Sequence, residues 1–250
     1  MQLLMRLEDN DLIQEGEYMK ICIDAGHYAK YNKSPVNDKY YESEMTWKLH
    51  EYLKKELESL GIKVITTRSD QTKDLGLTSR GNKASGCDLF LSIHSNACNT
   101  ESEDFPLACC SVSGKADAIG KKLADTVASV MGTKQNGRIW KRQGKSGDYY
   151  GVLRGAAAVG VPGVLLEHSF HTNRKATEWL LVDSNLKKLA KAEAKTIASF
   201  YGIKTPSDNI TTDNKSSLYK VQVGAFSKKE NAVKLCEELK VKGYDAIVIH

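Results

Sequence analysis

Short apolar runs alternate with longer amphipathic stretches from residue 20 onward. The runs KICID, KVITTR, CDLFLSI, LACCSV and VPGVLLE have the length of single buried strands. Helical spacing appears in MTWKLHEYLKKELESLG, residues 78–85, KADAIGKKLADTVASVMG, ATEWLLV and SNLKKLAKAEAKTIASFYG. This alternation predicts an α/β fold, with a mixed, mostly parallel central sheet and helices on both faces.

A polar stretch divides the chain. Residues 204–217, KTPSDNITTDNKSS, are dominated by Ser, Thr, Asp and Asn, so we predict a linker that ends a first domain over residues 19–203. Beyond it, LYKVQVGAF, KKENAVKLCEELKVKG and YDAIVIH predict a small β-α-β segment over residues 218–250. A segment of this length buries little core by itself.

The first 18 residues differ in character from the rest of the chain. They lack the basic leader and long apolar core of a secretory signal, and they carry several acidic side chains. Met19 then opens the first strand run, MKICIDAGH. We expect residues 1–18 to be an extension outside the fold, with a short N-terminal helix as the alternative.

Composition narrows the class of protein. A hydrophobic fraction of 41% with 27% charged residues is typical of a soluble globular chain. No apolar run approaches the ~20 residues that span a bilayer, so we expect no membrane insertion. The net charge of +5 suits an anionic polymer such as a cell wall. This charge is too diffuse to predict nucleic-acid binding, and the sequence shows no nucleic-acid-binding motif beside it.

Three apolar runs end in residues that bind metals or assist metal chemistry. His27 follows ICIDAG, His94 follows DLFLSI, and Glu167 follows VPGVLL. In open α/β sheets, ligands and catalytic groups collect where strands end. Zinc hydrolases commonly offer three protein ligands and one open position. The two histidines therefore predict a zinc site at this rim, although each taken alone is more typical of a core or surface histidine.

The third ligand should be a carboxylate at the helix start in YYESEMTW. At ~100° per residue, Glu42 lies within ~20° of Leu49, whereas Glu44 lies ~140° away. The stripe that we expect to be buried comprises Leu49, Leu53, Leu57 and Leu60. Glu42 is thus the predicted ligand. The alternative is that both are ordinary first-turn carboxylates favoured by the helix dipole.

Glu167 is predicted to be the general base and acid. A carboxylate at the end of a buried strand is costly unless it is paired or has a chemical task. Beside zinc it would take a proton from bound water and pass it to a leaving amine. The alternatives are a fourth metal ligand or a structural ion pair with Arg154 or Lys141.

These motifs together resemble a known family. DAGH, Glu42, TR followed by Leu77-x-x-Arg80, DLFLSIHSNA and VLLE-x-x-F-x-x-N are similar to the zinc-dependent N-acetylmuramoyl-L-alanine amidases of type 3. The resemblance covers roughly residues 19–203. It implies a phosphorylase/hydrolase-like fold and hydrolysis of the amide between the lactyl group of N-acetylmuramic acid and L-alanine. It also implies His27, Glu42 and His94 as zinc ligands and Glu167 as the catalytic residue.

The chain departs from the family pattern at two places. Ala25 stands where proline is common, and His168-Ser169 replaces the usual Leu-Gly after Glu167. His168 and His171 thus follow the site closely in sequence. We expect them to be exposed loop residues, with contacts to the metal ligands or to the substrate as the alternative.

Weaker candidates for substrate contact are Arg80, Asn96 and Arg154, since arginine suits carboxylates. Their alternatives are surface or capping arginines and a turn asparagine. Residues 134–148 predict a basic loop in which Trp140 either lies along anionic wall polymer or is simply solvated.

The C-terminal segment resembles the first half of a SPOR domain. The matching residues are YKVQVGAFS, then AVKLCEEL, then KGYDA, all within residues 218–250. Domains of this family bind peptidoglycan glycan strands, so the resemblance implies a partial wall-binding segment.

We therefore predict a peptidoglycan amidase with Zn²⁺ as cofactor. The expected role is that of a phage or prophage endolysin, made in the cytoplasm without a signal peptide and acting on the wall after release. The alternatives are a bacterial autolysin or germination amidase, secreted in that case. Two further alternatives are a zinc carboxypeptidase that acts on stem peptides and a non-catalytic wall-binding protein.

Overall fold

The computed structural model describes residues 19–203, 223–242, 246 and 248. It divides into two units, Met1–Asn209 and Ile210–His250, and each is described by itself. The predicted extension over residues 1–18 and the predicted linker over residues 204–217 lie outside the described residues.

A six-stranded sheet forms the centre of the first unit. Its strand order is β2-β1-β3-β8-β4-β5. The strands are β1 (Lys20–Ala25), β2 (Lys63–Thr66), β3 (Leu89–Asn96), β4 (Leu107–Cys110), β5 (Arg138–Trp140) and β8 (Gly163–Phe170). Neighbouring strands are parallel except for β4 and β8. The predicted mixed, mostly parallel sheet is thus confirmed.

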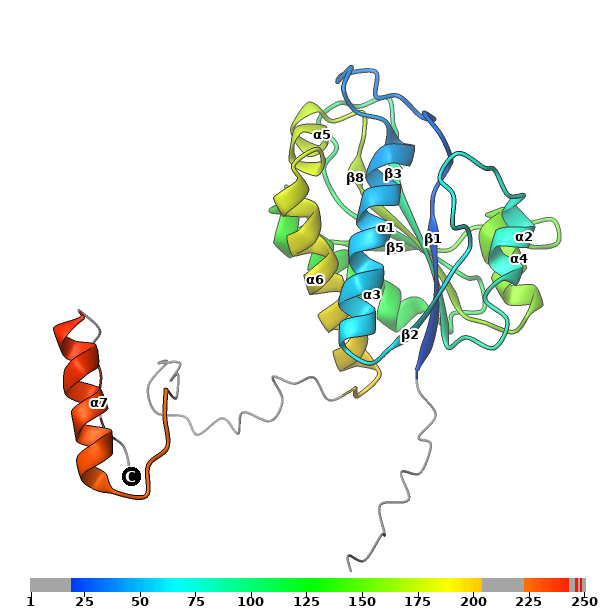
Figure 1. The fold of residues 1–250 in the computed structure, drawn as a ribbon. Coiled ribbons are helices and arrows are strands. Elements are labelled where there is room, and N and C mark those ends of the chain that lie inside the picture. Colours follow the sequence, from blue (N-terminus) through cyan, green and yellow to red (C-terminus); the bar gives the residue numbers. More distant parts are fainter. Residues whose placement is uncertain (1–18, 204–222, 243–245, 247, 249–250) are drawn as a thin grey trace, which may run out of the picture. The chain divides into compact units, whose positions relative to one another are not determined.

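Helices cover both faces of this sheet (Figure 1). On one face lie α1 (Glu42–Ser59), α3 (Asp117–Met131) and α6 (Asp183–Phe200), with the short α5 (Arg174–Leu180) beside α6. On the other face α2 (Leu77–Asn82) packs on α4 (Gly151–Ala158). Among the described residues, no helix has the length and apolar character to cross a membrane.

Each face has its own apolar core, and β3 shows how one strand serves both. Leu89, Leu91 and Ile93 join the core beneath α1, α3 and α6. Phe90, which points to the opposite face, joins the core beneath α2 and α4. Because successive strand residues alternate between faces, a strand covered on both sides is apolar throughout. This explains the unbroken apolar runs in the sequence.

Strand β8 carries a bulge just after Glu167. His94 pairs with Glu167, but Asn96 pairs with Phe170, so β8 holds one residue more than β3 over this stretch. Ser169 has a left-handed φ of 60° there, and its hydroxyl donates to Asp104 at 2.7 Å. The bulge turns Phe170 into the core under α2 and α4. Bulges redirect side chains in this way and are frequent next to active sites.

The predicted loop over residues 134–148 is wrong in part. Arg138–Trp140 form β5 on the edge of the sheet, and β6 (Gln143–Gly144) pairs with β7 (Gly147–Asp148) in a hairpin. The three residues of β5 are all exposed and have no apolar run, so only their pairing with β4 makes them a strand.

The described part of the second unit contains the helix α7 (Lys229–Val241), and this confirms the helix predicted there. Residues 223–226, the end of the predicted strand LYKVQVGAF, are not in a strand. The rest of that strand and most of YDAIVIH lie outside the described residues.

Candidate metal centre

His27 lies directly beyond the end of β1, where the chain turns. It adopts a left-handed φ of 59°, which is strained for a residue with a side chain. Gly26 before it leaves no room for a Cβ, which would meet the His94 ring at 2.4 Å. Gly26 is thus required for space, while the unusual backbone conformation belongs to His27 itself.

Glu42 is the first residue of α1 and is buried. Its Oε1 lies 2.9 Å from Nδ1 of His94 and also accepts the backbone N–H of Ser95. Its Oε2 lies 3.2 Å from Nε2 of His27. The helix stripe therefore carries Glu42 to the sheet rim, as the periodicity predicted.

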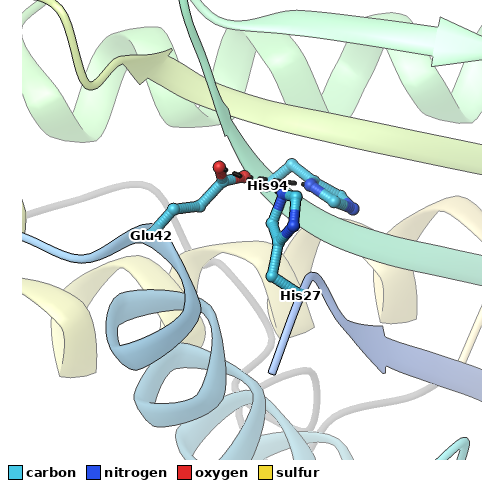
Figure 2. A group of neighbouring side chains, drawn as sticks. All are labelled: His27, Glu42 and His94. Atoms are coloured by element: carbon cyan, nitrogen blue, oxygen red, sulfur yellow. Dashed lines mark hydrogen bonds and ion pairs between the residues drawn. The ribbon is translucent and has the colours of Figure 1, made fainter. Parts of the chain in front are cut away.

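His94, on β3, completes a cluster with His27 and Glu42. One ligand atom from each residue lies within 4.8 Å of the others. Figure 2 shows the three side chains pointing toward one another from the end of β1, the start of α1 and β3. Two imidazoles and one carboxylate are a donor set that suits zinc.

The charge state of Glu42 fits that of a ligand. Burial alone raises its pKa, but the hydrogen bonds and charges of His27 and His94 outweigh burial and hold the pKa of Glu42 well below its usual range. The carboxylate is therefore ionised, as a metal ligand must be.

Glu167 faces this cluster from the neighbouring strand. It is the register partner of His94, so the two backbones are about 4.8 Å apart. Its Oε2 is buried and has no hydrogen-bond partner among the described residues. Burial and the charge of Glu42 raise its pKa well above the usual value. A buried carboxylate oxygen without a partner is costly, so this arrangement points to a chemical task.

The structural ion pair considered for Glu167 is absent from the described residues. Arg154 donates instead to the backbone oxygens of Asp148 and Tyr149, at 2.8 and 2.7 Å. Lys141 pairs with Asp117 at 2.6 Å.

Asn32 was not predicted from the sequence, and it joins two of the candidate ligands. Its amide nitrogen lies 3.0 Å from Nε2 of His27 and donates to Oε2 of Glu42 at 2.8 Å. Asn32 itself has a φ of 51°, a conformation that asparagine tolerates.

His171 was predicted to be an exposed loop residue, which is wrong. It is buried, with Nδ1 2.9 Å from the carbonyl of Ser95 and 3.7 Å from Oε2 of Glu42. Tyr40 stacks beside it and donates to the Ser95 hydroxyl at 2.8 Å. The β8 bulge and the turn after it bring His171 back under the site.

His168 was also predicted to be exposed, and it is fully buried. Its Nδ1 donates to the carbonyl of His94 at 3.0 Å, and its Nε2 donates to Glu193 on α6 at 2.8 Å. Burial lowers the pKa of His168, but Glu193 outweighs burial and raises it. With acceptors at both ring nitrogens, the imidazolium is held between β3 and α6.

Arg80 is buried and its guanidinium has partners within the protein. It donates to the carbonyl of Leu75 and pairs with Asp74, both at 2.8 Å. A third partner, Asp24, lies 3.9 Å away beneath the end of β1. Arg80 thus supports the backbone that leads to His27 and is not accessible to a substrate.

The other two candidates for substrate contact lie closer to the surface. Asn96, at the end of β3, is partly exposed, and its side-chain oxygen accepts the N–H of Ala97 at 2.8 Å. Arg154 is partly exposed on α4. Neither belongs to the His27–Glu42–His94 cluster.

The fold and this cluster define an α/β enzyme with a candidate metal centre at the strand ends. The chain belongs to the N-acetylmuramoyl-L-alanine amidase family, whose sequence profile matches residues 21–199. The resemblance seen in the sequence, and the prediction of an amidase that acts on peptidoglycan, are confirmed.

Two curated relatives span most of the chain. The amidase CwlM of Bacillus licheniformis is 29% identical over 238 residues, covering 93% of this chain and 85% of the relative. The sporulation-specific amidase of Bacillus subtilis strain 168 is 28% identical over 239 residues, covering 92% and 84%.

Solved structures show the same fold. The catalytic domain of CwlV from Bacillus (Paenibacillus) polymyxa var. colistinus has a TM-score of 0.64 at 23% identity, covering 74% of this chain and 99% of that one. An amidase from Clostridium difficile 630 has a TM-score of 0.65 at 20% identity, covering 76% and 100%.

A SPOR domain profile matches residues 183–250, which confirms the resemblance of the C-terminal segment. The match begins earlier than the predicted residue 218. Its first part is α6, whose Leu186, Leu189 and Ile197 belong to the core of the first unit.

Proposed function

We propose that this chain hydrolyses the amide between the lactyl group of N-acetylmuramic acid and L-alanine, with zinc held by His27, Glu42 and His94. The convergence of these three ligand atoms at the strand ends is the observation that carries the proposal. When bound, zinc lowers the pKa of a water ligand to about 7 and polarises a carbonyl oxygen.

Glu167 is proposed to move the proton. Its Oε2 is buried and lacks a partner among the described residues, so no internal hydrogen bond there competes with water or with a substrate amine. Its raised pKa suits a group that accepts a proton and then donates it near neutral pH. The carboxylate takes the proton of the attacking water and returns it to the nitrogen of L-alanine as the amide bond breaks.

The surrounding residues keep the ligands in position. Asn32 and the backbone N–H of Ser95 fix the two oxygens of Glu42. His168 fixes the carbonyl of His94. Ligand orientation by such partners commonly changes metal affinity by 10- to 100-fold.

For the cellular role we retain two proposals. One is a phage or prophage endolysin, made in the cytoplasm and released to the wall. The other is a bacterial, secreted wall amidase, which the two Bacillus relatives support. Lysis of expressing cells only when a membrane-permeabilising protein is co-expressed would support the first, and lysis without one would contradict it.

The proposal is tested by metal analysis and by product analysis on purified walls. The parent should carry about one zinc per chain, and chelation should abolish turnover. Glu167→Gln should keep its zinc and lose roughly 10²–10⁴-fold in turnover, while Glu42→Gln should lose zinc. Glu44→Gln, on the same helix turn, is the matched control and should behave as the parent does.

The products distinguish the remaining alternatives. An amidase exposes a new amino terminus on L-alanine and leaves the glycan intact, whereas a carboxypeptidase releases the last amino acid of the stem peptide. Wall binding without turnover would indicate a non-catalytic protein. Full turnover by Glu167→Gln would overturn the proposed mechanism.

A further inference from the structure

An exposed group of aromatic and basic side chains lies at the edge of the sheet. Trp140 and Tyr149 are each 47% exposed, a large fraction for side chains of this kind. Arg142, also exposed, lies between them. We call these three residues the aromatic platform.

The platform is held in place by its own contacts. The guanidinium carbon of Arg142 lies 3.4 Å from the centre of the Tyr149 ring and 5.7 Å from that of Trp140. The N–H of Tyr149 donates to the carbonyl of Arg142 at 2.9 Å and closes the β6–β7 hairpin. Arg154 donates to the carbonyl of Tyr149, which anchors the hairpin to α4. The rings are therefore presented on a fixed backbone.

Strand register places the platform on the same sheet face as the proposed catalytic residue. Glu167 pairs with Leu107, and Leu107 pairs with Arg138, so Arg138 lies two strands away in the same row, at about 10 Å. Trp140 stands two residues further along β5 and shares that face. Through Cys109, Trp140 is level with Leu165, so it lies two strands and two residues away from Glu167 on that face.

The two arginines near Trp140 have no carboxylate partner within the described residues. Among the described residues, neither Arg138 nor Arg142 forms an ion pair with a carboxylate, although both are exposed. Arg138 packs over the ring of Phe105 at 3.9 Å, and its guanidinium donates to the side-chain oxygen of Gln135. Aromatic faces accept the apolar C–H faces of sugar rings, and arginine pairs with carboxylates. The peptidoglycan strand carries both kinds of group.

We propose that the aromatic platform is a glycan subsite, on which sugar units next to the cleaved muramoyl unit stack. Trp140 and Tyr149 supply the stacking faces, and Arg142 fixes both rings and meets carboxylates of neighbouring stem peptides. The inference rests on peptidoglycan being the substrate, and it places the longer glycan strand along β5 from the site at Glu167.

The test compares a polymeric with a minimal substrate in the full chain. Trp140→Ala and Tyr149→Ala should each lower kcat/KM on soluble, uncross-linked glycan strands by about 5- to 10-fold, chiefly through KM. Turnover of muramoyl dipeptide, which has a single sugar, should stay within about twofold of the parent because that substrate does not reach the platform. Trp140→Tyr, which retains a stacking face, should recover most of the loss.

Phe200→Ala is the matched control, because Phe200 is an exposed aromatic residue on α6, on the other face of the sheet. It should leave both substrates unaffected. Equal losses on both substrates would show a structural role, and no loss on either would show an inert patch; each result overturns the proposal. Loss of all turnover in Glu167→Gln, with platform variants unaffected, would uphold the mechanism and reject the subsite.

A second measurement does not depend on alanine variants. Binding of the same glycan strands to the Glu167→Gln protein should change the tryptophan fluorescence, and the added change Trp140→Phe should remove most of that signal. A fluorescence change that persists in Trp140→Phe would assign binding to another part of the chain.

Discussion

His27 and Ser169 both have a left-handed backbone conformation, which few residues other than glycine adopt. Both have φ near +60°, the first beside the candidate metal centre and the second in the β8 bulge. Each such position costs about 1–3 kcal/mol and persists only when surrounding contacts compensate. The family pattern has glycine where Ser169 stands, and the left-handed conformation explains that preference.

The single residue Glu167 carries a prediction for the metal-free protein. Its folded-state pKa is raised, so the folded state binds more protons than the unfolded state. The free energy of unfolding should therefore fall as pH rises from about 4.5 through the folded pKa. Glu167→Gln should lack this fall and should be more stable than the parent at pH 7. Urea unfolding in excess chelator from pH 4.5 to 7.5 measures both.

The control for that series is Glu44→Gln, whose curve should run parallel to that of the parent. Parallel curves for Glu167→Gln and the parent would contradict the prediction, because they would show that ionising Glu167 costs the folded state nothing.

Among the helices and strands, α6 and β8 are joined by a buried charged pair beneath the site. His168 comes directly after Glu167 in β8 and contacts Glu193, and both side chains have no exposed surface. Because His168 also donates to the carbonyl of His94, the pair connects a core helix to a strand that supplies a candidate ligand. It is both a packing element and a support for the site.

Removing one partner of this pair should lower the free energy of unfolding strongly, whereas replacing both partners with leucine should not. Glu193→Ala should lower the free energy of unfolding by about 3–5 kcal/mol, because it leaves His168 buried without its partner. The double change His168→Leu with Glu193→Leu should restore most of that loss. A double-mutant cycle measured by urea unfolding gives the coupling energy.

The surface pair Lys121–Asp125 on α3 provides the comparison. Asp125→Ala should change stability by less than about 1 kcal/mol, since exposed pairs contribute little. Additive effects of the two leucine substitutions would show that His168 and Glu193 are not energetically coupled.

Over the chain as a whole, the SPOR match overlaps the catalytic unit. The match begins at residue 183, yet α6 supplies core residues to the first unit. The first unit of the structure therefore includes α6, although the match begins at its first residue.

Two truncations separate these boundaries. A chain ending at Ile203 should fold, turn over muramoyl dipeptide as the full chain does, and bind insoluble walls roughly tenfold less tightly. A chain ending at Val182 removes the whole matched range and should not fold, because α6 covers the sheet. Circular dichroism and wall sedimentation measure the two outcomes. Unchanged wall binding by the shorter folded chain would show that the C-terminal segment adds nothing.

Local periodicity in the sequence predicted the five longer strands and most of the helices of the first unit, and it placed His27, Glu42, His94 and Glu167 at or near their ends. It did not predict β5, the β6–β7 hairpin or α4. A buried strand and a helix stripe are properties of neighbouring residues, so both can be read without knowing the fold. The roles of these four residues remain predictions until metal and activity are measured.

The residues that surround these four became known from the tertiary structure alone. Asn32 reaches two candidate ligands, and His168 meets Glu193, 25 positions further along the chain. The exposed β5 is a strand only because it pairs with β4. That pairing puts Trp140 on the same face of the sheet as Glu167. Such contacts depend on register and on a bulge, which arise from packing between distant segments and leave no periodic signal in the sequence.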